Sequence, residues 1–253
     1  MTNANEPYII IPRSVFYDHD KYNHLSPEEL YIFAWLYRHR LYAGDNEWMT
    51  MLSINDISQC IRLRASNGKD DTRNKVRIKE ILITLKQKGY INPAQNINKD
   101  TPYHQLLDIF YPEYRGYDKN IKYDIFDNFK DEPSEFMIYA CIDRRGEEGR
   151  NISFKSWEKI MGHKKEKLEN LFKKMNTDEY HTRIWKFSGE YYTNEKGEIR
   201  QEINEYYTRP SESVKNLWYQ SNNVKRSKQK KETNLAFGRK GGTSKDWGDE
   251  NPF

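Results

Sequence analysis

The feature that most constrains the fold is an order of elements that occurs twice, about 100 residues apart. In the first half, Ser26–Glu29 combines an N-cap serine, a proline and two glutamates, which predicts the start of a helix. Ser53 is expected to cap a second, short helix. Apolar residues from Ile78 to Leu85 have the spacing of a third helix, which Gly89 ends. Strand patterns accompany these helices at Tyr8–Pro12, Trp48–Leu52, Tyr90–Ile91 and Leu106–Tyr111.

The second half repeats this order. Ser134 is expected to cap a helix that carries Phe136, and the segment Asn151–Phe154 predicts a strand followed by a short helix. The apolar stripe from Leu168 to Met175 predicts the third helix of this copy. A strand at Ile184–Phe187 and a long hairpin from Tyr191 to Tyr207, with glycine in its turn, then complete the half. Residues 211–220 have the pattern of a last short helix.

Helix, strand, helix, helix, strand, wing and strand is the order of winged-helix domains, in which the second and third helices form a helix-turn-helix. The sequence therefore predicts an α+β protein with two winged-helix domains in tandem, at residues 1–118 and 119–221. From residue 222 onward almost no side chain could enter a core, so we expect residues 222–253 to be a disordered basic tail.

The first copy resembles the N-terminal domain of plasmid replication initiator protein A and its relatives among Gram-positive replication proteins. The resemblance spans residues 8–110 and is carried by Tyr8–Pro12, Leu25–Tyr31, Ser53–Ile57 and Leu85–Ile91. It implies a DNA-binding role at the start of replication of a plasmid, phage or mobile element.

The charge of the chain is unevenly distributed, although its net value is only +4. Residues 222–245 carry eight Lys and Arg against Glu232 alone, and residues 246–253 carry three acidic residues. Within the remaining neutral body, residues 62–88 hold nine basic residues and three acidic ones. Such clustering favours a polyanionic partner, which we expect to be double-stranded DNA.

In the first copy, the polar side of the third helix is expected to enter the major groove. We expect Arg73, Asn74 and Arg77 to face outward there, with arginine suited to guanine and asparagine to adenine. The phosphate contacts predicted beside them are Arg62, Arg64, Lys69 and Lys75. The alternative is that these charges form only the solvated face of a helix.

The second copy offers a comparable set of candidate DNA contacts. Four of them lie at the start of its third helix: His163, Lys164, Lys165 and Lys167. Three lie on or near the hairpin: Arg183, Lys186 and Lys196. The acidic residues Glu166 and Glu169 reduce the positive charge of this surface. The alternative is that the surface serves domain packing or a homodimer.

The last eight residues, 246–253, resemble the acidic C-terminal tip of bacterial single-stranded-DNA-binding proteins. The resemblance implies that this tip binds a host replication or repair protein, through a terminal ring in an apolar pocket and acidic residues on a basic rim. The partner-binding residues would be Trp247, Asp249, Glu250, Pro252 and Phe253. An acidic end that folds back on the basic tail is the alternative.

The sequence gives little support to other classes. It has no phosphate-binding loop, no HExxH motif and no His-hydrophobic-His pair, so we expect no enzyme, no catalytic residue, no cofactor and no metal. Cys60 and Cys141 are expected to be reduced thiols in the core. Without an apolar run of membrane-spanning length or a leader pattern, we expect no membrane partner and a cytoplasmic location.

Two further functions remain open from the sequence. The same two modules could serve a transcriptional regulator, in which the tail adds only non-specific affinity for DNA. They could also form an interaction scaffold whose winged helices bind protein.

Overall fold

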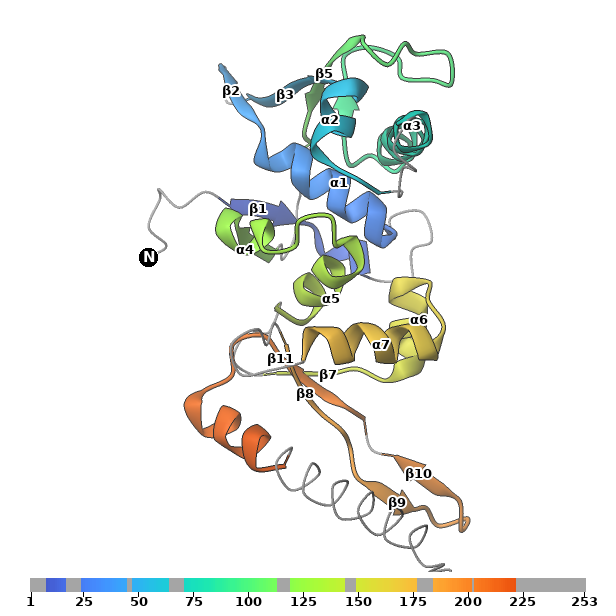
Figure 1. Ribbon diagram of the computed structural model, residues 1–253, viewed down its shortest axis with the longest axis vertical. Coiled ribbons are helices and arrows are strands. Elements are labelled where there is room, and N and C mark those ends of the chain that lie inside the picture. The colour runs from blue at the N-terminus through green and yellow to red at the C-terminus, as the bar shows by residue number, and fades with distance from the viewer. Residues whose placement is uncertain are drawn as a thin grey trace, which may run out of the picture. The chain divides into compact units, whose positions relative to one another are not determined.

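The first half of the chain forms a helical pair that packs on a central helix and on an antiparallel sheet (Figure 1). The pair consists of α2 (Ile54–Cys60) and α3 (Thr72–Gln87), and the central helix is α1 (Pro27–Arg38). The sheet has the strand order β2 (Leu41–Gly44), β3 (Glu47–Ser53), β5 (Leu106–Phe110), β4 (Asn92–Pro93). Before α1 lie β1 (Tyr8–Ile11) and the 3-10 helix η1 (Arg13–Phe16).

The second half has the same kinds of elements. In this computed structural model it begins with β6 (Lys119–Lys122), α4 (Tyr123–Asp127) and α5 (Pro133–Asp143). The helical pair of this half is α6 (Phe154–Met161) and α7 (Lys165–Met175). Its strands are β7 (Arg150–Asn151), β8 (Trp185–Phe187), β9 (Tyr191–Thr193), β10 (Ile199–Gln201) and β11 (Glu205–Tyr207). The structure describes residues 8–16, 24–44, 47–63, 71–112, 119–143, 149–176, 184–201 and 203–221.

The two halves share an order of helices and part of a strand order. In each half a helix and at least one strand precede the helical pair, and further strands follow it: β4 and β5 in the first half, β8 to β11 in the second. The last strand of each half lies between a strand before the helical pair and a strand after it, since β5 separates β3 from β4 and β11 separates β7 from β8. The predicted order of the helices is therefore confirmed, as is a mixed α+β fold with small antiparallel sheets.

The helix starts predicted in the first half are confirmed by their hydrogen bonds. The hydroxyl of Ser26 accepts a hydrogen bond from the backbone N–H of Glu29 at 3.4 Å, and the Glu29 carboxylate accepts one from the N–H of Ser26 at 2.9 Å. Ser53 and Asp56 form the same reciprocal pair before α2. These hydrogen bonds satisfy N–H groups that have no partner inside the helix, so the local sequence is enough to locate the starts of both helices.

Strand pairing and helix packing join the two halves across residue 118. Strand β1 pairs with β6, with Ile9 opposite Ile121, and α1 packs against α5. All residues of α1 from Leu30 to Tyr37 are buried, because the helix is covered from both halves. The chain up to Arg209 belongs to one compact unit, and Pro210 begins a second unit that is helical at residues 212–221. The domain boundaries at 118 and 221 stay predictions.

Several local predictions were wrong. Ser134 does not cap α5, because the helix already begins at Pro133; the Ser134 hydroxyl instead lies 3.2 Å from Nε2 of His163. Tyr90 and Ile91 are not a strand, because the N–H of Tyr90 bonds back to the carbonyl of Leu85 in the turn that ends α3. Cys60, expected in the core, is exposed, whereas Cys141 is buried.

Candidate nucleic-acid interface

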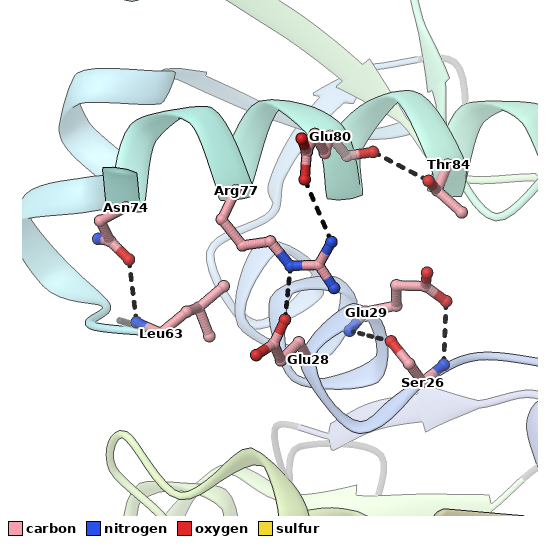
Figure 2. Close-up of polar contacts among 8 residues, drawn as sticks. All are labelled: Ser26, Glu28, Glu29, Leu63, Asn74, Arg77, Glu80 and Thr84. Atoms are coloured by element: carbon pink, nitrogen blue, oxygen red, sulfur yellow. Dashed lines mark hydrogen bonds and ion pairs between the residues drawn. The ribbon is translucent and has the colours of Figure 1, made fainter. Parts of the chain in front are cut away.

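Asn74, on the first turn of α3, faces into the protein, and its predicted outward orientation is wrong. Its side chain is only 2% exposed. The side-chain oxygen accepts a hydrogen bond from the backbone N–H of Leu63 at 3.0 Å (Figure 2). The side-chain nitrogen donates to the carbonyl of Ile61 at 2.7 Å. The buried amide thus ties the start of α3 to the end of α2, and it is not placed to contact a base.

Arg77 also points toward the protein and not outward from α3. Its Nε donates a hydrogen bond to the carboxylate of Glu28 on α1 at 2.6 Å, and its Nη1 to that of Glu80 at 3.2 Å (Figure 2). Burial alone would lower the pKa of the Arg77 guanidinium, but the bonds and charges of Glu28 and Glu80 outweigh it and raise that pKa. Arg77 therefore holds α3 against α1, which corrects its expected outward orientation.

The exposed part of the first candidate set is smaller than the sequence suggested. Arg73 and Arg62 are exposed, and Lys75 is half-buried. The backbone N–H of Arg62 donates to the carboxylate of Asp131 at 2.9 Å, which fixes the chain where it leaves α2. Arg64 and Lys69 lie outside the described residues.

The second helical pair presents more exposed cations. Lys164, Lys165 and Lys167 are all exposed at the start of α7. The carboxylate of Glu158 on α6 accepts a hydrogen bond from the backbone N–H of Lys165 at 3.0 Å, which fixes the turn between the two helices. Sequence reasoning missed two further exposed lysines on α6, Lys155 and Lys159, because they do not lie on the helix expected to enter the groove.

Lysines near the hairpin differ in their surroundings. Lys186 is half-buried, and its ammonium lies 4.8 Å from the centre of the Phe154 ring and 5.6 Å from that of Phe172. Lys196 is exposed in the turn between β9 and β10, where Gly197 adopts a φ of 75°. The hairpin also exposes Tyr191 and Ile199. Arg183 lies outside the described residues.

His163 connects the second candidate set to the first half. The imidazole is half-buried, and burial, with a smaller effect from Lys167, lowers its pKa below the ordinary 6.5. The carboxylate of Glu28 acts in the opposite direction and raises this pKa. Glu28 thus pairs directly with Arg77 on α3 and acts on His163 only through its charge.

The partner-binding residues predicted at the C-terminal tip, residues 246–253, lie outside the described residues, as does the basic segment before them. Within the described ranges, His, Cys, Asp and Glu side chains form no group that could hold a metal ion. A helix with the length and apolar character needed to cross a membrane is likewise not found in the described part of the chain. No protein-family model, no curated protein and no solved structure matches the chain.

Proposed function

We propose that this protein binds double-stranded DNA through two winged-helix domains in tandem. The strand order of both halves supports this fold, since in each half the last strand lies between a strand that precedes the helical pair and a strand that follows it. The observation that carries the proposal is the placement of exposed cations at the start of the second helix of each pair. These cations are Arg73 on α3 and Lys164, Lys165 and Lys167 around the first turn of α7.

The physical basis is the phosphate backbone of DNA. When exposed lysines and arginines neutralise phosphates, counterions condensed on the DNA are released. This release supplies much of the affinity for DNA. Arg73 is also the first candidate for a guanine contact, because an arginine can pair with two acceptors on the major-groove edge of that base. With Asn74 and Arg77 turned inward, α7 carries more of the proposed interface than α3.

The biological role that we propose is replication initiation, or an accessory role in it, for a plasmid, phage or mobile element. Support comes from the resemblance of residues 8–110 to plasmid initiators and of residues 246–253 to the tip of single-stranded-DNA-binding proteins. In this proposal the helical pairs bind origin DNA and the tip recruits a host replication or repair protein.

A second candidate function is a scaffold that binds protein. It is favoured by the outer face of the four-stranded sheet, where Leu41, Met51 and Leu106 are 68%, 51% and 56% exposed. Exposed apolar side chains gathered on one sheet often mark a protein-binding surface.

The experiment that separates the two functions is selection of duplex DNA from a random pool by the full chain, at two salt concentrations. DNA binding predicts an enriched sequence and an affinity that falls with salt. Replacing Lys164, Lys165 and Lys167 together by alanine should then weaken binding. Lys173→Ala, at the other end of the same helix, is the matched control and should leave it unchanged. No enrichment, and equal binding by both variants, would contradict DNA recognition by these helices.

A further inference from the structure

Aromatic rings fill the junction between the two halves. The ring of Tyr31 on α1 lies 5.2 Å from that of Phe126 on α4 and 6.0 Å from that of Phe136 on α5, measured between ring centres. Phe126 and Phe136 also meet edge to face at 4.9 Å. Tyr31 is 3% exposed and Phe136 is fully buried, and both belong to one apolar core that includes residues of both halves.

Hydrogen bonds between polar groups also cross this apolar junction. The hydroxyl of Tyr31 accepts a hydrogen bond from the backbone N–H of Asp131 at 2.9 Å, and burial raises the pKa of this phenol to about 12, so it stays protonated at neutral pH. Arg38, at the end of α1, donates to the carboxylate of Asp127 at 2.6 Å. Hydrogen bonds have preferred angles, so they restrict rotation at a junction where apolar contacts alone would allow sliding.

Asp131 extends this junction to the first helical pair. Its carboxylate accepts the hydrogen bond from the backbone N–H of Arg62, while Asn74 holds the next residue, Leu63. Residues 62 and 63, which leave α2 toward α3, are thus held both by α3 and by the second half. Arg77 of α3 also donates a hydrogen bond to Glu28 of α1, the helix that packs against α5 of the second half.

From these contacts we propose that the two helical pairs form one rigid reading unit, which recognises a single composite DNA site whose two half-sites have one fixed spacing. Domains in one chain move relative to each other unless their interface is large and apolar, and the shared core meets that condition. The inference rests on the proposed DNA binding, which it makes more specific. It excludes the alternative in which two loosely tethered readers accept half-sites at several spacings.

The consequence for DNA is geometric. One inserted base pair moves a half-site by about 3.4 Å along the duplex and rotates it by roughly a tenth of a turn. Hydrogen bonds to base edges need donor–acceptor distances of about 2.7–3.2 Å, so a rigid pair of readers would lose one half-site completely. Two flexibly tethered domains would instead follow the displaced half-site and keep most of the affinity gained from binding both half-sites at once.

The first test uses the full chain and the duplex that it selects. Footprints of Arg73→Ala and of the triple alanine variant at Lys164, Lys165 and Lys167 assign each half-site to one helical pair. Insertions of one, five and ten base pairs then separate the half-sites. We expect every insertion to weaken binding by about 100-fold or more, to the level of one half-site alone. Near-native affinity for any of these spacings would overturn the inference while leaving DNA binding intact.

The second test does not depend on DNA. Spin labels at Gln87→Cys on α3 and Lys173→Cys on α7, both exposed positions, report the distance between the two helical pairs in a chain with Cys60→Ser. We expect one narrow distance distribution in the free protein. A broad or two-peaked distribution would overturn the inference. If the distribution is narrow but the chain selects no DNA sequence in the first test, the proposed DNA binding is wrong and the rigid junction is not.

Discussion

The side-chain oxygen of Asn74 accepts a hydrogen bond from the backbone N–H of Leu63 at 3.0 Å, and so joins the first turn of α3 to the chain just after α2. Asparagine is a residue type suited to contacting adenine, but here its side chain holds α3 to the end of α2. The same amide donates to the carbonyl of Ile61, so both of its polar atoms are used inside the protein. Stability and DNA affinity should therefore depend on different residues of α3, although these residues are adjacent in the sequence.

Asn74→Ala should lower the free energy of unfolding by about 1–3 kcal/mol, because it leaves the buried N–H of Leu63 and the carbonyl of Ile61 without their partner. Urea denaturation measures this loss. Arg73→Ala, a change at the exposed residue just before Asn74, is the matched control. It is expected to alter stability by at most about 0.5 kcal/mol while weakening DNA binding. Equal stability of the two variants would contradict the structural role of Asn74.

Asp131 has a φ of 57°, a left-handed conformation that among the described non-glycine residues is found only here. Asp131→Asn should be close to wild type in stability, since asparagine tolerates this conformation and keeps an oxygen that can accept from Arg62. Asp131→Ala should lose about 0.5–1.5 kcal/mol for the hydrogen bond and a further ~1–2 kcal/mol for backbone strain. Asp131→Gly, which relieves the strain, should lie between them in urea denaturation. A glycine variant less stable than the alanine variant would contradict this order.

His163 predicts a dependence of stability on pH. Because its pKa in the folded protein is lowered below 6.5, protonation favours the unfolded chain, in which the pKa is ordinary. Its contribution to stability is therefore complete above pH 6.5 and is lost as the pH falls toward the lowered value. In thermal denaturation, wild type should lose more stability between pH 7.5 and 5.5 than His163→Asn, which cannot be protonated in this range. Parallel curves for the two proteins would show that His163 does not titrate as its surroundings imply.

Removal of residues 246–253 tests the proposed recruitment of a host protein. The deletion takes away three acidic residues and none of the proposed DNA contacts, so affinity for the selected duplex should be unchanged or slightly higher at low salt. Replication of a plasmid that depends on this protein should be lost. If such a plasmid still replicates, the tip has no recruiting role; if duplex affinity falls as well, the segment contributes to DNA binding itself.

The sequence predicted the parts of the fold that depend on neighbouring residues. The reciprocal hydrogen bonds at Ser26 and Ser53 and the buried stripe of α3 all arise within a few residues, so local patterns locate them. The pairing of β1 with β6 was not predicted, because its two strands are separated by the whole first half. Ser134 failed as a cap because Pro133, which suits the first turn of a helix, lies before it.

For the candidate site, residue type and charge clustering were informative and side-chain direction was not. Asn74 and Arg77 have the polar character of groove-contacting residues, yet their partners are set by how α3 packs on α1 and α2. The acidic partners Glu28 and Asp131 belong to elements far from α3 in the sequence. A partner that approaches only in the folded protein leaves no local pattern, so only the structure could identify these contacts.

The pairing of β1 with β6 also bears on how the chain folds as it is synthesised. Ile9 is fully buried opposite Ile121, so its strand partner leaves the ribosome more than a hundred residues later. At about 5–20 residues per second, β1 and one side of α1 would wait for roughly 5–20 seconds with apolar side chains uncovered. During that interval the nascent first half is a natural client for chaperones that bind apolar segments, and fast translation of residues 12–122 would shorten its exposure.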